Sequence, residues 1–435
     1  MPSQSDQEET NGRWRRSADI PRWDSAELSA AGISVYHSKH LTLVTDLPEE
    51  QVAMLPPLAD RLFENLELRL GKLPPARDAS EFRITGYLIA ARERFQSVGL
   101  MPEEEFVIRH GRHLNYEFWM FNPTTDYYRR HLLFHEFIHC FMTCEHGMRD
   151  IPPLWFTEGI AEYFATHRLS SAAPEQIQFG ILPESHEGYE GWGRISEIHR
   201  SFLVEPADDI AASGITPFDD VLNPPSSVFI RDDQYAHAWA ACWMMFNLPA
   251  LSREAAGLRS VRSARDFQDW QTAASAQHRQ TLQWWPLVLD GLTEGSDPAA
   301  LVTPAGHAAT PISGDTVSCR IEAPQGWQST GVLLSRNRSV TIEATGEAVV
   351  NETTRPWHSE PDGITIRYHR GLPVGTLVGM VVSDDGRFAS RRFRVGSRRT
   401  LSSPEAGHLW LQVNESAADR TNNQGGYQVT ISAAQ

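Results

Sequence analysis

Residues 131–147 read HLLFHEFIHCFMTCEHG, with histidines spaced four apart at positions 131, 135 and 139. A Thr-Thr-Asp run stands before this stretch and Gly147 ends it, so the sequence predicts one helix over residues 124–147. Residues four apart on a helix differ by about 40° of rotation, so His135 and His139 project from one face and can share a cation. The alternatives are packed core histidines or a solvated polar face.

The residues around this histidine pair fit a catalytic metal site. Glu136 follows the first histidine and completes an HExxH motif, in which the glutamate can act on water without binding the metal. A catalytic zinc needs a third protein ligand and one open coordination position. Eighteen residues separate His139 from Glu158, which lies in LWFTEGIAEYF, a stretch that predicts a second helix. Glu158 is therefore the candidate third ligand.

HExxH, eighteen residues and then a glutamate within LWxxEGxAxYF resemble the gluzincin zinc metallopeptidases, particularly the aminopeptidase N type and the bacterial peptidase-MA-like group. The resemblance covers roughly residues 30–290, and about 30 residues of it carry specific motifs. It implies that His135, His139 and Glu158 bind one zinc ion. It also implies that Glu136 is the general base, which takes a proton from a zinc-bound water and later delivers it to the leaving amine.

Two neighbouring residues are candidates for supporting roles. Glu162 stands four residues after the proposed ligand Glu158, and related gluzincins place an acidic residue there. The resemblance thus implies that Glu162 orients His135 through its free ring nitrogen, the alternative being a solvated helix glutamate. His131 is expected either behind the ligands or on the surface, because a fourth zinc ligand would close the site and block catalysis.

Substrate-directed residues are harder to assign. Gluzincins often use a Tyr or His from a later helix to stabilise the oxyanion, and DDQYAHAWAACW offers Tyr235 and His237. Tyr235 is favoured, and the alternative for either residue is ordinary core packing. Aminopeptidase N relatives carry a GxMEN segment whose glutamate grips the free amine of the substrate, and this chain has none. Its absence favours an endopeptidase or an unusual substrate, with exopeptidase action left open.

The sequence predicts a multidomain α+β protein. Residues 1–25 are polar and predict a flexible tail. Residues 26–295 combine a small sheet with a helical active-site region and predict the peptidase domain. Residues 296–312 are rich in Pro, Gly and Ala, as in a linker. Residues 313–435 show short alternating runs between turn signals, which predict an all-β sandwich.

The C-terminal stretch resembles the PA-IL-type galactophilic lectin fold of bacteria, on GWQSTGVLL, LPVGTLVGMVVSD and HLWLQVNESAADRTNNQGGYQVTIS. The resemblance implies a calcium site formed by the backbone carbonyl of Val350 and four side chains, those of Glu415, Asp419, Asn422 and Asn423. Oxygen ligands suit calcium, and the alternative is a turn whose Asn and Asp side chains satisfy their own backbone. Two departures weaken the expectation of galactose binding. Glu415 replaces an expected aspartate, and SEPDG at 359–363 replaces a His-Pro-Asp-Gln stretch.

Bulk composition narrows the class of protein. The chain has 435 residues, 41% of them hydrophobic and 22% charged, which is typical of a soluble globular protein. Its net charge of −16 argues against nucleic acid as the main partner. Four cysteines without a CxxC pair predict neither a disulfide framework nor a thiolate zinc site. The N-terminus lacks the apolar segment of a signal peptide, so we expect a cytoplasmic protein, or an extracytoplasmic one whose signal was removed.

Three hypotheses for the whole protein follow. The first is a zinc metallopeptidase whose lectin-like domain directs it to a glycosylated substrate or surface. The second is a carbohydrate- or surface-binding protein on an inactive peptidase scaffold, against which the intact Glu136 argues. The third is a zinc hydrolase that acts on a non-peptide amide, since the same attacking water serves either carbonyl. Cleavage preference and oligomeric state leave no signal in the sequence.

Overall fold

The computed structural model confirms the α+β class, and the chain folds as two compact units. The described residues are 20–74, 76, 80–102, 108, 110–146, 151–170, 176–182, 195, 198–199, 210–223, 232–277, 279–293, 295–304, 306, 308–312, 316–350 and 355–434. The first unit consists of Met1–Trp192, Ala238–Phe246 and Ala250–Ala274, and the second of Gly193–His237, Asn247–Pro249 and Ser275–Gln435. Most of the predicted tail lies outside the described residues, and its last residue, Ser25, begins helix α2.

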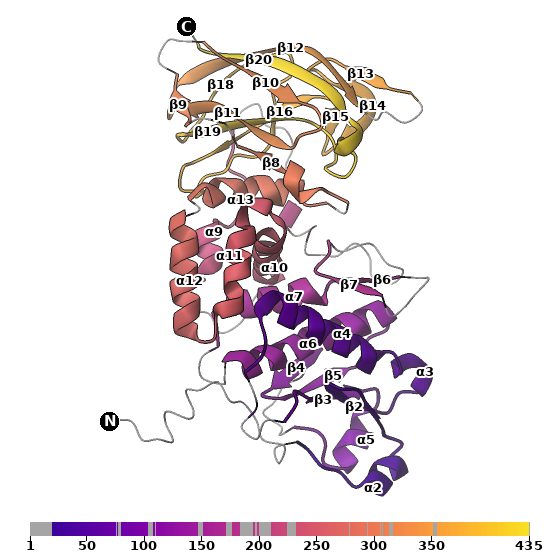
Figure 1. Ribbon diagram of the computed structural model, residues 1–435. Helices are drawn as coiled ribbons and strands as arrows, with labels where there is room; N and C mark the ends of the chain where they lie inside the picture. The colour runs from indigo at the N-terminus through magenta and orange to yellow at the C-terminus, as the bar shows by residue number, and fades with distance from the viewer. Residues whose placement is uncertain are drawn as a thin grey trace, which may run out of the picture. The chain divides into compact units, whose positions relative to one another are not determined.

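The first unit is built on a five-stranded sheet in the order β1-β2-β3-β5-β4 (Figure 1). Its strands are β1 (Ser34–His37), β2 (Leu41–Thr45), β3 (Ile84–Ile89), β4 (Gly111–Leu114) and β5 (Glu117–Phe121). β2, β3 and β5 are parallel, whereas β1 and β4 run antiparallel to their neighbours. β4 is thus an edge strand of this sheet.

Helices cover both faces of this sheet, which is why every residue of β2 and β3 is buried (Figure 1). α2 (Ser25–Ala30) and α5 (Arg92–Ser97) lie on one side, where Phe95 packs in a cluster with Tyr87 and Trp119. α4 (Leu55–Leu70) and α6 (Asp126–His146) lie on the other side and contact β2, β3, β4 and β5. Helix α6 therefore rests on the sheet next to its edge strand.

The rest of the first unit is mainly helical. Its elements are α3 (Glu49–Val52), α7 (Leu154–Ala165), β6 (His167–Leu169), β7 (Ile177–Phe179), most of α10 (Asp232–Asn247), α11 (Ser252–Gly257) and most of α12 (Ala264–Gln277). Gly159 allows α7 and α10 to approach closely, because a Cβ at Gly159 would lie 2.5 Å from the carbonyl oxygen of Ala238. A larger residue there would push apart two helices of the unit.

The second unit is a β-sandwich with helices α9 (Phe218–Leu222) and α13 (Arg279–Gly291) (Figure 1). One sheet contains β10 (Val317–Glu322), β20 (Gln424–Ala433), β12 (Ser339–Val350), β13 (Trp357–Ser359) and β18 (Arg398–Ser402). The other contains β17 (Phe393–Arg394), β16 (Leu377–Val382), β19 (Gly407–Val413), β11 (Trp327–Leu334), β8 (Val302–Thr303) and β9 (Thr310–Pro311). Strands β14 (Ile364–His369) and β15 (Leu372–Val374) form a separate hairpin. Alternating apolar residues of both sheets form the core, as expected for a sandwich.

The stretch 296–312, whose composition predicts a linker, contributes to this unit. β8 and β9 both pair in parallel with β11. Each is only two residues long, too short for a period-two pattern to show in the sequence. This stretch therefore extends the second sheet of the sandwich.

Asp290, near the end of α13, ties this helix to the sandwich. Its buried carboxylate pairs with Arg370 and Arg392 and accepts a hydrogen bond of 3.0 Å from Trp327 Nε1. Burial alone would raise the pKa of Asp290, but the two guanidinium groups hold it well below its usual range. The ion pairs neutralise a charge that would otherwise be costly to bury.

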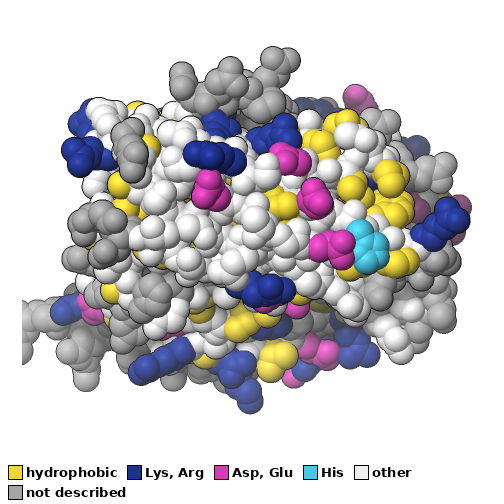
Figure 2. Space-filling view, turned by 90° about the horizontal axis from the view of Figure 1, so that it is seen from above, with side chains coloured by type: hydrophobic (Ala, Val, Ile, Leu, Met, Phe, Trp, Pro, Cys, Tyr) yellow, Lys and Arg dark blue, Asp and Glu magenta, His cyan; other side chains and the backbone are white. Residues whose placement is uncertain are grey.

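The face seen in Figure 2 carries charged side chains of both signs. There, Lys and Arg side chains stand among Asp and Glu and small groups of hydrophobic side chains. Among the side chains coloured in that view, no broad basic patch is visible. Within the described residues, no helix combines the length and apolar composition that a membrane span requires.

Candidate metal centre

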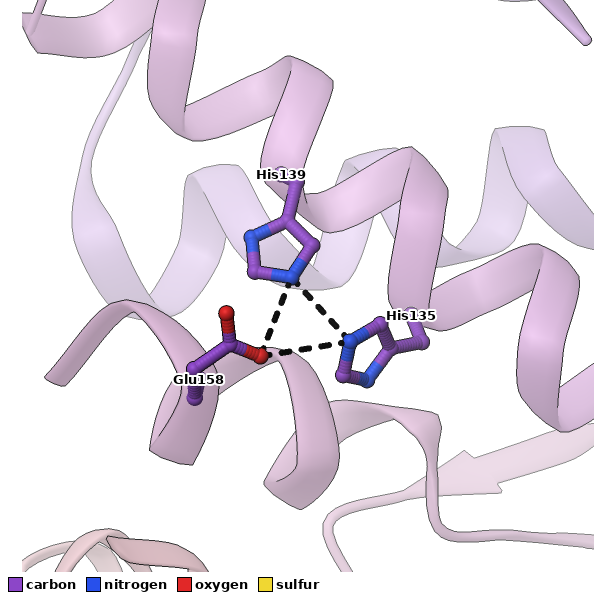
Figure 3. Close-up of side chains that lie close together, drawn as sticks. All are labelled: His135, His139 and Glu158. Carbon is purple, nitrogen blue, oxygen red and sulfur yellow. Dashed lines mark hydrogen bonds and ion pairs between the residues drawn. The ribbon is translucent and has the colours of Figure 1, made fainter. Parts of the chain in front are cut away.

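Helix α6 carries the two histidines of the HExxH motif. It runs from Asp126 to His146, close to the predicted 124–147, and is buried over most of its circumference. Such burial on all sides is typical of a core helix, so its polar residues need partners within the protein. His135 and His139 both point toward α7 (Figure 3).

Helix α7 presents Glu158 to this pair. Pro153 precedes its first residue, and the helix is anchored by the buried aromatic rings of Trp155 and Phe156. Because α7 is apolar over most of its length, tertiary packing rather than solvent exposure fixes its rotation. Glu158 therefore faces α6, as the sequence analysis expects for a rigid third ligand.

Three ligand atoms converge at this point: Nε2 of His135, Nε2 of His139 and Oε2 of Glu158 (Figure 3). The two nitrogens are 3.1 Å apart, and the carboxylate oxygen lies 3.4 Å from the first and 3.3 Å from the second. Atoms that each lie about 2.0–2.1 Å from one tetrahedral zinc ion are about 3.3 Å from each other. The triangle thus has the dimensions of one face of a zinc coordination tetrahedron.

The chemistry of the three donors also fits a cation. Glu158 Oε2 is buried and makes no hydrogen bond within the described residues. Its separations from the two rings exceed the roughly 2.7–2.9 Å of a charge-assisted hydrogen bond. Burial alone would lower the pKa of His135, but the surrounding carboxylates, led by Glu158, raise it to about 9. These residues form a buried, negatively biased group that could hold a metal ion.

Glu136 lies beside this group and is held by the edge strand β4. Its side chain is only 6% exposed, and the backbone N–H of His113 donates a hydrogen bond to its carboxylate. Burial raises the pKa of Glu136 above its ordinary value. The ring of His113 stacks on that of His139 at 4.5 Å, and its Nδ1 lies 3.8 Å from Glu136 Oε2. Burial lowers the pKa of His113 to about 3, so this ring is neutral.

Neither His113 nor Gly111 was predicted from the sequence as a site residue. At Gly111 a Cβ would lie 2.5 Å from Glu136 Oε1, so only glycine lets β4 run this close to the carboxylate. The sequence signal was a glycine four residues before the turn into β5, which is weak without the strand register. Strand pairing supplies what the sequence lacks, since Gly111 faces Met120 across the ladder.

If this group hydrolyses peptide bonds, as proposed below, we expect Gly111→Ala to lower the rate of hydrolysis without removing any of the three candidate metal ligands. The added methyl must displace either the Glu136 carboxylate or the β4 backbone, and a displacement of about 1 Å can cost on the order of 100-fold in rate. Comparing kcat/KM and zinc content of the two proteins measures this. Gly306→Ala is the matched control, because a Cβ at Gly306 meets nothing within 4 Å and its φ lies outside the left-handed region. Hydrolysis equal in Gly111→Ala and the control would contradict the proposed close approach.

Glu162 lies behind His135, on the side away from the three-atom group. Its Oε1 is 3.4 Å from His135 Nδ1, and its Oε2 is 3.8 Å from His131 Nε2. His131 is buried, so its surface alternative is wrong, and it stands next to Glu162 instead. A carboxylate in this position fixes the ring orientation of a metal-binding histidine.

Glu162→Gln is expected to weaken zinc binding by about 10–100-fold, because the neutral amide holds the His135 ring less firmly. Competition with a chromophoric chelator measures the affinity directly. Glu64→Gln serves as the control, since Glu64 is exposed on α4 and pairs only with the exposed Arg61 among the contacts described. An unchanged zinc affinity would show that Glu162 does not orient the ligand.

The structure does not test the predicted role of Tyr235. Tyr235 and His237 lie on the first turns of α10, and this part of the helix belongs to the second unit. His237 is buried, with its ring 6.2 Å from that of Trp285. Oxyanion stabilisation by Tyr235 therefore stays a prediction.

The predicted calcium ligands come together in part. Glu415 Oε2 accepts a hydrogen bond of 2.8 Å from Asn423 Nδ2, and Glu415 Oε1 pairs with Arg367, which the sequence analysis did not single out. Arg367 Nη1 also lies 3.5 Å from Asp419 Oδ2. Asn422 Oδ1 is buried and makes no hydrogen bond within the described residues. Val350 ends β12, immediately before residues outside the described part.

Comparisons with known proteins show distant similarity alone. No family model and no curated protein matches the chain. A PllA-like lectin, the EclA N-terminal domain, is 20% identical, with 28% of this chain and 98% of that one covered and a TM-score of 0.23. The metallopeptidase IMPa from Pseudomonas aeruginosa is 16% identical, with 44% and 21% covered and a TM-score of 0.17. The structure of IMPa in complex with an O-glycopeptide is also 16% identical. That match covers 45% of this chain and 23% of the other, with a TM-score of 0.17. The chain spans less than a quarter of the length of these metallopeptidase chains.

Proposed function

We propose that this protein is a zinc-dependent metallopeptidase. The observation that carries the proposal is the triangle of His135, His139 and Glu158, whose ligand atoms lie 3.1–3.4 Å apart beside the buried carboxylate of Glu136. Among the described residues, the group has three members and no fourth His, Cys, Asp or Glu. Three protein ligands leave one position of a tetrahedral ion open, as in catalytic zinc sites.

Each residue has a defined task in this proposal. His135, His139 and Glu158 would hold the ion, which when bound lowers the pKa of water and polarises the scissile carbonyl. Glu136 accepts a proton from the attacking water at its carboxylate and later donates it to the leaving amine. The His113 backbone N–H and the close approach of Gly111 hold this carboxylate in place. Tyr235 is the proposed oxyanion donor.

A binding protein on an inactive scaffold is the weaker alternative. A site that only stabilises the fold is closed by four protein ligands and needs no neighbouring base. Here Glu136 is present, buried and packed against β4, and its position requires a glycine at residue 111. A zinc hydrolase acting on a non-peptide amide would use the same residues, so only the substrate distinguishes it.

We further propose that the substrate is a glycosylated peptide or protein, with residues 26–295 acting as the peptidase and residues 313–435 as a lectin-like domain. The support is the sequence resemblance of residues 313–435 to a galactophilic lectin fold. One of the distant structural neighbours was solved with an O-glycopeptide, which makes that class the first to try. No nucleic acid is expected to take part, since the net charge is −16.

The test joins metal analysis to a substrate screen. Purified protein is expected to contain about one zinc per chain by plasma mass spectrometry, with no zinc added. It is then incubated with a peptide library and with one mucin-type glycoprotein before and after enzymatic deglycosylation. Cleavage of the glycosylated form alone supports the full proposal, and cleavage of plain peptides supports the peptidase without the glycan preference. A zinc-loaded protein that cleaves neither, but hydrolyses small amides, would favour the non-peptide alternative.

A further inference from the structure

The C-terminal sandwich buries a carboxylate whose two oxygens are both engaged by nitrogen donors. The Glu415 side chain is 0% exposed and follows strand β19. Its Oε1 pairs with Arg367 Nη2, and its Oε2 accepts a 2.8 Å hydrogen bond from Asn423 Nδ2. A buried carboxylate is stable only when it is paired and hydrogen-bonded. Arg367 supplies the positive charge that Glu415 requires.

Arg367 also reaches a second carboxylate and an aromatic ring. It lies on β14, far from Glu415 in the sequence, and its Nη1 is 3.5 Å from Asp419 Oδ2. Its guanidinium carbon is 5.8 Å from the centre of the Trp357 ring. A planar guanidinium can bridge two carboxylates with separate nitrogens and stack on an aromatic ring at the same time. The side chain thus has three kinds of contact that fix its position.

These residues do not fit a calcium ion in the present arrangement. Calcium takes six to eight oxygen ligands at about 2.3–2.6 Å. Asn423 instead turns its amide nitrogen to Glu415 Oε2 and to the carbonyl oxygen of Ala323, 3.4 Å away, so its oxygen does not face the carboxylate. A cation beside Glu415 and Asp419 would also meet the charge of Arg367.

We propose that Arg367 is a built-in cation that takes the place of calcium between Glu415 and Asp419, so that this sandwich folds and functions without a bound metal. The inference does not depend on the proposed peptidase activity, because all the residues involved belong to the second unit. The buried Asn422 Oδ1, which makes no hydrogen bond within the described residues, is the one atom here that a cation would explain. A direct calcium titration therefore decides the matter.

The first experiment uses the full wild-type chain, freed of calcium and kept loaded with zinc. Calcium chloride is titrated in a calorimeter up to about 1 mM, the weak end of the range for extracellular calcium modules. Hydrogen exchange of peptides from β19 and β20 is measured with and without calcium, since these strands flank Glu415. We expect no binding heat and no change in exchange. Saturable binding of one calcium with added protection of these strands would overturn the proposal.

Substitutions at Arg367 provide the second arm. Arg367→Gln leaves Glu415 buried without a counter-charge, so β19 and β20 should exchange at least about tenfold faster, and calcium should restore protection. Arg367→Lys keeps the charge and should stay calcium-independent. If Arg367→Gln does not fold, the double variant with Glu415→Gln removes both charges and should recover the fold without calcium.

Arg398→Gln is the matched control for these variants. Arg398 lies on β18 of the same unit, is 71% exposed, and pairs with the half-exposed Glu343. We expect its exchange to equal that of the wild type with and without calcium. Equal exchange in Arg367→Gln and Arg398→Gln would show that Arg367 does not neutralise the buried carboxylate, which would contradict the proposal.

Discussion

Glu136→Gln is expected to keep about one zinc per chain while peptide hydrolysis falls about 10²–10⁴-fold. The carboxamide has nearly the same size and can keep the hydrogen bond from the His113 backbone, but it cannot accept the proton of the attacking water. Because Glu136 is not among the three converging ligand atoms, zinc should stay in place. Plasma mass spectrometry and single-turnover kinetics on the same preparation measure the two quantities.

Glu64→Gln provides the control for this substitution, since it makes the same chemical change at an exposed position of α4. We expect the control to match the wild type in zinc content and in rate. A Glu136→Gln protein with a rate within a few-fold of the wild type would refute the role of Glu136 as general base. Loss of zinc from that variant would instead place Glu136 among the ligands.

Of these substitutions, Glu158→Gln should reduce zinc affinity most strongly, by more than about 100-fold. That figure is the largest loss of affinity typical for residues that only orient a metal ligand. The substitution replaces an anionic ligand by a neutral amide, and it removes the only carboxylate among the three converging atoms. Zinc content after dialysis against a chelator, compared with the wild type and Glu64→Gln, measures the effect. Hydrolysis should fall in proportion to the zinc lost, and excess zinc should restore part of it.

Loss of fold must be separated from loss of metal in this variant. Near-ultraviolet circular dichroism reports the packing of the aromatic side chains as a whole, among them Trp155 and Phe156 on α7, the helix that carries Glu158. We expect this spectrum to be preserved, since glutamine has nearly the size and shape of glutamate and Glu158 Oε2 makes no hydrogen bond within the described residues. A folded variant that holds as much zinc as the wild type would remove Glu158 from the proposed site.

Most of the three-residue group that could hold a metal ion was predictable, because the spacing within each helix is local. His135 and His139 share a face by helix periodicity alone, and Glu158 sits on a second helix with its own clear pattern. The sequence could not show that α7 turns Glu158 toward α6, which depends on packing. The 3.1–3.4 Å triangle is therefore information that only the structure supplies.

The residues that hold Glu136 could not be predicted from the sequence, for a physical reason. β4 is four residues long, and its burial alternates only between intermediate and exposed, so it lacks the apolar alternation of a strand. Its place beside the metal group follows from antiparallel pairing with β5, which sets His113 against Phe118. Arg367 was missed for a similar reason, since a hairpin distant in the sequence brings it to Glu415.

The path of the chain through the two units has a practical consequence for protein engineering. Residues 193–237 belong to the second unit, yet the chain returns to the first before 275–435 completes the second. In α13, Asp290 pairs with Arg370 of the sandwich. Trp285 of the same helix donates a hydrogen bond to the backbone oxygen of Thr216, which lies in the earlier segment 193–237. The sandwich therefore cannot be excised as one continuous segment. A fragment starting at residue 313 would lack α13 and its contacts, and exchanging the sandwich for another binding domain would require several junctions in the chain.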